Sequence, residues 1–441
     1  MNTRLASLRL ARRRVSTGTS TFQSTCGNAR SQSDIPRGYL LTFGNADDGR
    51  LGSPSIDDDS GGDDDDRDHR DHRDDRDHRD ERHLRHPSSN IPTLVPSLPH
   101  SVVGVRLGGA HTLILDEQGT VFACGLNDDG QCGLDGSEAA QVWEPEEVPV
   151  PEDVTRVAAG HRSSYAVGRE RVWRWGGEGG TGLPRVVPLP DGAAAKDVVD
   201  VVAGNGYSII VTVEGRALLY LEGDVDDMSH APDPVDLCPG TKIVKASAGH
   251  YHAALLDDQG IVRLVPNVYS RKVAETLVDQ SAHIVHPVRD VACGGGQTLV
   301  ALEGGGVMAW GQGDALGLGD GEGRRVPTRI RGLDGAEVVS VAAGWKHSGA
   351  IDHAGRLYMW GWGGSQGGSI SLIESRGSGG GQLGLGDDCD AWAPRVVQMI
   401  RMGKGKGKGK GKGGLEIPYE YWRAVDLSLG INHSAVVVEK S

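Results

Sequence analysis

A short apolar phrase that ends in glycine recurs seven times along this chain. Its clearest copy is VVSVAAG, which ends at Gly344. The other copies end at Gly108, Gly160, Gly204, Gly249, Gly294 and Gly430. By subtraction, consecutive glycines are 52, 44, 45, 45, 50 and 86 residues apart. A period of this size marks a repeat architecture, in which each unit buries its apolar surface only against its neighbours.

The unit around Gly344 has the pattern of three short strands. Residues 338–343 are rich in valine and alternate along the chain, and residues 347–351 and 357–360 follow after tight turns. Such alternation is typical of strands, and Gly344 allows a turn that a Cβ atom would hinder. Three or four strands per period indicate a propeller rather than a helical solenoid. The chain is therefore predicted to be all-β and to form a seven-bladed β-propeller.

Three motifs connect this repeat to a known family. They are GWKHS at 344–348, GRLYMWG at 355–361 and GQLGLG at 381–386, with weaker copies near 108–133 and 310–320. These residues resemble the repeat of the regulator of chromosome condensation family, over residues 38–441. The resemblance implies a propeller for that range. It implies little about activity, because one fold hosts many functions.

The two ends of the repeat region are incomplete units that complement each other. Residues 38–52 match only the last strand of a repeat and the loop after it, whereas residues 424–438 match its first two strands. We therefore predict that N- and C-terminal strands share one blade. This arrangement closes the ring and removes open sheet edges.

Residues 1–37 form a basic tail that stands apart from the repeats. The acid-free stretch before Asp34 holds serine, threonine and six arginines, at positions 4, 9, 12, 13, 14 and 30. This composition is typical of an organelle transit peptide, and a disordered or nuclear-targeting tail is the alternative. The six cysteines are far apart and include no Cys-x-x-Cys, which favours a reducing compartment. The predicted location is the mitochondrial matrix, with nucleus or cytoplasm as alternatives, and the resemblance would then be to a mitochondrial member of the family.

Three segments of biased composition interrupt the repeats. An Asp/Arg/His-rich insertion is predicted to be disordered over 53–98, a Gly/Ser-rich insertion covers 364–380, and a Gly-Lys run covers 403–414. The Asp and His residues of the first insertion could hold a divalent cation loosely. A solvated loop is favoured, because ordering flexible ligands costs entropy. The Gly-Lys run could touch phosphate or an acidic partner, although a flexible loop is again favoured.

Histidine follows four of the seven glycines at the same offset, at positions 111, 252, 347 and 433. Equivalent positions in different blades are spread around a ring, so these histidines are not predicted to form a catalytic cluster. Ser163 and Gln297 occupy the slot in two other repeats. Polar substitution of this kind fits a structural hydrogen bond to the neighbouring backbone better than acid–base chemistry.

The sequence contains no pattern typical of an enzyme. We find no phosphate-binding loop, no Gly-x-Ser-x-Gly elbow and no metal-spaced Cys/His set. The prediction is a non-enzymatic protein without a cofactor. A propeller presents two faces of loops, and the net charge of −14 disfavours nucleic acid as the partner of either face.

Three functions remain open from the sequence. The first is a protein-binding scaffold that supports organelle assembly or gene expression, with an assembly or ribosomal factor as its partner. The resemblance implies a second, a guanine-nucleotide exchange factor for a small GTPase, but the repeats between Gly204 and Gly294 show no added hairpin like the wedge of the family's founder. The third is a UV-B photoreceptor, ranked last because only 344–348 approaches the receptor motif Gly-Trp-Arg-His-Thr, with Lys346 in place of arginine.

Five loop residues are predicted to contact a partner, because loops on a regular scaffold carry specificity. They are Asp128, Asp129, Trp345, Lys346 and Asp387.

Overall fold

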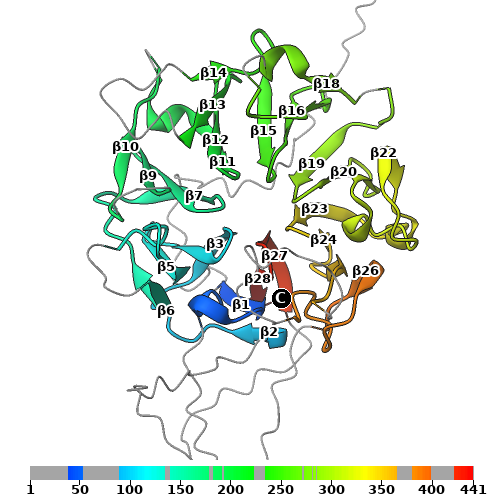
Figure 1. The fold of residues 1–441 in the computed structure, drawn as a ribbon, viewed down its shortest axis with the longest axis horizontal. Coiled ribbons are helices and arrows are strands. Elements are labelled where there is room, and N and C mark those ends of the chain that lie inside the picture. Colours follow the sequence, from blue (N-terminus) through cyan, green and yellow to red (C-terminus); the bar gives the residue numbers. More distant parts are fainter. Residues whose placement is uncertain are drawn as a thin grey trace, which may run out of the picture.

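The structure is a computed structural model that describes residues 38–52, 89–134, 140–177, 182–190, 193–222, 234–270, 273–280, 282–284, 286–364, 380–398 and 422–440. Within these ranges, the strands β1 to β28 form seven four-stranded sheets. The sheets stand around a ring as the blades of a propeller (Figure 1). The predicted all-β, seven-bladed fold is confirmed.

Six blades each use four strands that follow one another along the chain. Blade 1 contains β3 (Val102–Leu107), β4 (His111–Asp116), β5 (Val121–Leu126) and β6 (Gln141–Glu147). Blade 2 contains β7 (Val154–Ala159), β8 (Ser163–Gly168), β9 (Val172–Gly176) and β10 (Arg185–Val187). Blade 3 contains β11 (Val198–Ala203), β12 (Tyr207–Thr212), β13 (Ala217–Leu221) and β14 (Val235–Asp236).

The second half of the ring repeats this order. Blade 4 contains β15 (Ile243–Ala248), β16 (Ala253–Asp257), β17 (Val262–Val265) and β18 (Val278–Asp279). Blade 5 contains β19 (Val288–Cys293), β20 (Gln297–Leu302), β21 (Val307–Gly311) and β22 (Arg324–Arg329). Blade 6 contains β23 (Val338–Ala343), β24 (His347–Asp352), β25 (Leu357–Gly361) and β26 (Ala391–Val396).

Blade 7 combines the two ends of the chain. Its sheet order is β2-β1-β28-β27, with β27 at Trp422–Leu429, β28 at His433–Lys440, β1 at Tyr39–Gly44 and β2 at Ser89–Leu94. Strand β28 pairs with β1 in antiparallel register from Tyr39↔Val438 to Gly44↔His433. Figure 1 shows the first and last strands side by side in this one blade. The predicted closure of the ring by both termini is confirmed.

The helices in the described ranges are short 3₁₀ turns between strands. They are η1 (Asp47–Gly49), η2 (Ala195–Asp197), η3 (Val273–Thr276), η4 (Gly313–Ala315) and η5 (Arg331–Leu333). The architecture therefore depends on strand pairing and on packing between blades.

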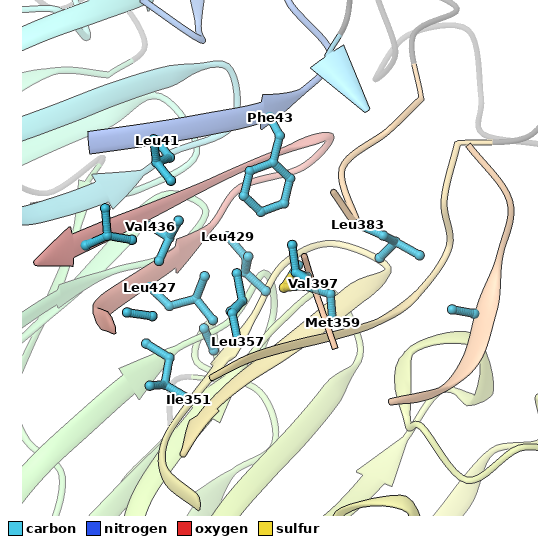
Figure 2. Close-up of a cluster of buried hydrophobic side chains, with 14 residues drawn as sticks. Leu41, Phe43, Ile351, Leu357, Met359, Leu383, Val397, Leu427, Leu429 and Val436 are labelled. Atoms are coloured by element: carbon cyan, nitrogen blue, oxygen red, sulfur yellow. The ribbon is translucent and has the colours of Figure 1, made fainter. Parts of the chain in front are cut away.

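The hydrophobic core is divided among the contacts between neighbouring blades. Seven clusters of buried side chains occur, one at each of the seven interfaces. Figure 2 shows the cluster between blades 6 and 7, where Leu41, Phe43 and Val436 meet Ile351 and Met359. Because every blade is buried on two sides, each one depends on both of its neighbours.

The tryptophans at the ends of third strands are core residues. Trp175 and Trp360 are almost completely buried. Their Nε1–H groups donate to carbonyls of the preceding blade, at 3.0 Å to Gln131 and 2.9 Å to Ala315. A buried indole needs such a partner, and the bond helps to hold one blade against the next.

Outer strands carry proline where an open sheet edge needs protection. Pro92, Pro145, Pro327 and Pro394 all lie within register shifts of β2, β6, β22 and β26. Proline lacks an N–H donor, so it is tolerated at an edge and discourages pairing with another chain.

The predicted insertion at 53–98 extends too far toward the C-terminus. Strand β2 covers Ser89–Leu94 and pairs with β1, and Val95 is buried in the cluster between blades 7 and 1. The strand forms by pairing with β1, as the outer strand of the closing blade. Pro92 lies in it as the other prolines lie in their outer strands. The predictions for 53–88, for the tail at 1–37, for 365–379 and for the Gly-Lys run at 403–414 lie outside the described residues.

Candidate functional site

The axis of the ring holds a cavity built from the repeats themselves. Each blade contributes three consecutive residues: the end of its first strand, the glycine after it, and the next residue. These runs are 107–109, 159–161, 203–205, 248–250, 293–295, 343–345 and 429–431. The lining therefore has three layers, each with one residue from every blade.

The glycine layer closes on itself around the axis. A Cβ atom on Gly344 would lie 2.6 Å from the carbonyl oxygen of Gly430, and one on Gly430 would lie 2.8 Å from that of Gly108. In five blades, the N–H after the glycine donates to the glycine carbonyl of the next blade at 2.9–3.3 Å, for example from Trp345 to Gly430 at 3.1 Å. None of the seven glycines has a positive φ. The sequence suggested that the turn conformation requires glycine at these positions. The structure shows that the close approach of the next blade requires it instead.

The substitution Gly344→Ala is expected to destabilise the fold by about 1–3 kcal/mol, because the new Cβ would overlap atoms that cannot easily move. It would lie 2.5 Å from Cε1 of His347 as well as 2.6 Å from the Gly430 carbonyl. The matched control is Gly104→Ala in β3, where the nearest atoms are 3.9 Å away. Urea denaturation of the two variants should separate them. Equal stabilities would contradict the role of the glycine layer.

The side chains that begin the second strands connect the blades. Nε2 of His111, His252 and His347 lies 2.9, 3.0 and 3.0 Å from a hydroxyl of the next blade, on Ser164, Thr298 and Ser434. These bonds support the predicted structural role. The predicted kind of backbone partner also occurs, since His252 bonds the backbone of Gln297 and His347 that of His433 in the next blade. Gln297 has the predicted kind of partner, because its Nε2 donates to the carbonyl of Gly344 at 2.9 Å.

The third layer of the cavity is the one that does not repeat. Its members are Gly109, His161, Asn205, His250, Gly295, Trp345 and Ile431. Rings from blades 2, 4 and 6 converge over the axis: His250 lies 5.5 Å from His161 and 4.4 Å from Trp345 between ring centroids, edge to face in both pairs. Glycines in blades 1 and 5 leave room for them. A Cβ on residue 109 would lie 2.9 Å from Nδ1 of His161, and one on residue 295 would lie 3.0 Å from Cε3 of Trp345.

The two histidines of this layer are neutral at physiological pH. Burial lowers the pKa of His250 to about 4, with a smaller effect from His161. Burial also lowers the pKa of His161, and the nearby Arg162 acts in the same direction. Nδ2 of Asn205 lies 3.1 Å from Nε2 of His250, and an amide nitrogen only donates, so this imidazole nitrogen accepts. The cavity therefore presents neutral aromatic rings.

The turns of the cavity share one face of the ring with the long loops. We call it the turn face: it carries the turns between first and second strands and the loops between third and fourth strands. Hydrogen bonds join the two sets, for example from the N–H of Trp362 to the carbonyl of Lys346 at 2.9 Å, and from Leu126 to Ala110 at 2.8 Å. The described parts of these loops carry the acidic residues Asp47, Asp48, Asp128, Asp129, Glu222, Glu275, Asp314, Asp320, Glu322, Asp387, Asp388 and Asp390.

Few cations offset this acidic rim in the described ranges. Within the same loops the basic residue is Arg50, which is buried and bound to Asp48 at 2.6 Å. The turns add Arg162, whose guanidinium lies 3.2 Å from Asp129, and Lys346. The described part of the turn face is therefore strongly acidic around a centre of neutral rings.

The structure places all five predicted contact residues on the turn face. Trp345 lines the cavity, with Lys346 next to it, and Asp128 is an exposed loop residue. Asp129 is less accessible because it binds Arg162, and the half-buried Asp387 accepts the N–H of Cys389 at 3.1 Å. Their role in binding stays a prediction.

Sequence reasoning missed the other side chains of the cavity. His161, Asn205 and His250 follow directly after the glycine of their repeat, and Tyr251 comes one residue later. Reading that one column across all seven repeats would have found the first three. The prediction considered only the histidines two residues further along each repeat, which are structural.

The described residues offer neither a metal-binding cluster nor a helix that could cross a membrane. They contain no group of three or more His, Cys, Asp or Glu side chains placed to hold a metal ion. None of their helices has the length and apolar character needed to cross a membrane.

The seven repeats form a closed ring that is joined by the glycine layer and has the non-repeating third layer at its centre. This arrangement defines a β-propeller of the repeat type. The family model described as the RCC1-like domain matches residues 39–436, and this chain belongs to that family. The sequence-level resemblance is thereby confirmed.

The chain is similar to several curated proteins of diverse description. It is 28% identical to human "Regulator of chromosome condensation" over 363 residues, which cover 71% of this chain and 80% of that protein. It is 29% identical to human "E3 ubiquitin-protein ligase HERC2" over 70% of this chain, but that match spans only 5% of the ligase. It is 25% identical to the Arabidopsis thaliana "RCC1 domain-containing protein RUG3, mitochondrial", over 59% of this chain and 54% of that protein.

Solved structures support the fold. The crystal structure of human WBSCR16 superposes with a TM-score of 0.66 at 21% identity, over 92% of this chain and all of that one. At this identity the likeness establishes the propeller and nothing more about activity.

Proposed function

We propose that this protein is a non-enzymatic scaffold that binds a partner protein with its turn face. One observation carries the proposal: the glycine layer is identical in all seven blades and the layer before it is apolar throughout, with leucine, alanine or cysteine, whereas the third layer mixes glycine, histidine, asparagine, tryptophan and isoleucine. Closing a ring needs only the repeating layers. Residues that depart from the repeat at the centre of an exposed face therefore favour recognition, and the surrounding loops supply further contacts.

The finer proposal is that the scaffold supports organelle assembly or gene expression in the mitochondrial matrix. Two observations support it: the acid-free, arginine-rich tail of the sequence and the similarity to a relative named as mitochondrial. A tag at Ser441 with mass spectrometry of the mature N-terminus tests it. Mitochondrial signal and loss of about 30 residues are expected; an uncut nuclear or cytosolic protein would contradict it.

The partner-binding proposal predicts that Tyr251→Ala removes specific proteins from affinity purifications of the tagged full chain. Tyr251 is 53% exposed beside the cavity, so its loss should not disturb folding. The control is Val213→Ala in the hairpin between β12 and β13, on the opposite face, where the side chain is 55% exposed. Quantitative mass spectrometry should show partners that are lost only from the Tyr251 variant. Identical partner sets for the wild type and both variants would contradict use of this face.

Exchange of guanine nucleotide on a small GTPase is the second candidate. Similarity to the human regulator of chromosome condensation and to a bovine protein named "Secretion-regulating guanine nucleotide exchange factor" (23% identical) favours it. The loop between β13 and β14, where the sequence shows no added hairpin, lies mostly outside the described residues. Release of labelled GDP from purified GTPases, accelerated in proportion to added protein, would establish exchange.

A further inference from the structure

We propose that the turn face takes an extended basic segment of its partner, with one lysine or arginine side chain seated on the rings of His250, Tyr251 and Trp345. This inference rests on the proposed function and specifies the chemistry of the partner. Its three supports are the ring cluster at the cavity, the exposed tyrosines beside it and the charge of the rim.

The ring cluster offers electron-rich surfaces to a cation. The ring of Tyr251 lies 4.1 Å from that of His250 and nearly perpendicular to it, and Trp345 approaches the same imidazole to 4.4 Å. The faces of such rings attract ammonium and guanidinium groups, most strongly where water is partly excluded. Both imidazoles are held neutral by burial, so they do not repel a cation as imidazolium would.

The exposed tyrosines extend this surface outward from the axis. Tyr269, in the loop after β17, is 42% exposed, and its hydroxyl donates to the carbonyl of Asn205 in the turn of the preceding blade. Its ring packs edge to face on buried Tyr207 at 6.1 Å. Tyr251 and Tyr269 are therefore anchored to the blades while their faces remain open. The aliphatic stems of lysine and arginine pack well on such rings while the charged ends stay solvated or paired.

The rim selects a positive partner. Exposed carboxylates in loops of blades 1, 5 and 6 lie on the same face as the cavity, among them Asp128, Asp314 and Asp388. Arg162 is offset by Asp129, which leaves Lys346 as the basic side chain of the described turns that forms no ion pair with a described residue. Charge complementarity of this kind attracts a basic segment and disfavours acidic peptides and nucleic acid.

Fluorescence anisotropy with labelled peptides tests the proposal on the full chain. The probes are a Gly-Lys repeat, a Gly-Arg repeat and a Gly-Glu repeat of equal length. Binding of both basic probes, weakening when NaCl is raised from about 50 to about 200 mM, and no binding of the acidic probe are expected. Tyr251→Ala should weaken binding about threefold to tenfold, the range of a single ring–cation contact.

Two matched variants separate the turn face from general charge effects. The double change Asp314→Lys with Asp388→Lys should weaken binding of the basic probes at least tenfold. A tenfold change corresponds to about 1.4 kcal/mol of binding free energy. Glu214→Lys with Glu303→Lys makes the same charge change in the hairpins of the opposite face and should leave binding within about twofold. Val213→Ala, in the hairpin between β12 and β13, is the control for loss of an exposed apolar side chain on the opposite face.

Several outcomes would overturn the proposal. Equal affinity for the Gly-Glu probe would exclude charge selection, and no binding of any probe would exclude the basic segment. Binding that ignores every cavity and rim variant, and disappears only when the acidic run 57–86 is deleted, would make that run the receptor. Loss of native partners from Tyr251→Ala without binding of basic probes would reject the partner chemistry while leaving the proposed function intact.

Discussion

Removing residues 431–441 is expected to abolish cooperative folding of the entire propeller. The deletion takes away β28, whose Ala435, Val436, Val437 and Val438 are at most 1% exposed. Val436 and Val438 belong to the cluster between blades 6 and 7, in which Figure 2 shows Val436, and Ala435 and Val437 belong to the cluster between blades 7 and 1. Burying a valine contributes about 1.5 kcal/mol or more, and a whole domain is stable by only about 5–15 kcal/mol.

Strand pairing makes this effect global. Strand β28 lies between β27 and β1, so its loss separates the N-terminal strands from the rest of the chain. The ring then opens, and the interfaces between blades 6, 7 and 1 lose one partner each. Thermal unfolding by circular dichroism and limited proteolysis should show a broad, early transition. Deleting only residues 440–441 is the control, and an unchanged cooperative transition after the longer deletion would refute ring closure as the source of stability.

A second large effect is expected from acid. Burial lowers the pKa of His111 to about 3 and that of His347 to about 3, whereas the pKa of histidine in an unfolded chain stays near its ordinary value of 6.5. Between these values the unfolded chain binds more protons than the folded one. The contribution of each histidine to the free energy of unfolding is therefore fully present above the pKa of the unfolded chain. It falls as the pH decreases from about 6.5 toward 3, by about 1.4 kcal/mol per pH unit for each histidine.

The repeats themselves provide the variant that tests this pH dependence. Blade 5 has Gln297 in the slot where blade 6 has His347, and its amide bonds the next blade without titrating. His347→Gln should lower stability by about 1 kcal/mol near neutral pH, the contribution of one hydrogen bond, and reduce the loss of stability on acidification. Urea denaturation at several pH values between about 5 and 7.5 measures both effects. Parallel pH profiles of the wild type and the variant would contradict the assignment.

The part of the fold that follows local rules was predictable. The period-two alternation in 338–343 and the recurring glycine indicate strands and their number per blade without any knowledge of distant contacts. The incomplete units at the two ends predicted the shared blade, because a ring needs both halves of it. Strand β2 was missed because its residues follow a highly charged run, and their strand character depends on pairing with β1.

The candidate site was predictable only in outline. Expected exposure in loops singled out Asp128, Trp345 and Asp387. The structure places them on one face, because the ends of first and third strands in a meander point the same way. The cluster of His161, His250 and Trp345 was not predicted. Its members come from blades 2, 4 and 6, and nothing local in the sequence shows that their side chains meet.

By itself, then, the sequence determined the all-β class, the seven blades and the joining of the two ends, since these depend on periodicities carried by every repeat. The tertiary structure alone decided that the glycines are required by the closeness of the next blade, that three histidines bond hydroxyls across interfaces, and that three rings cover the axis. The physical reason is distance along the chain: residues such as His161 and His250 are separated by two repeats, and only closure of the ring brings them to 5.5 Å.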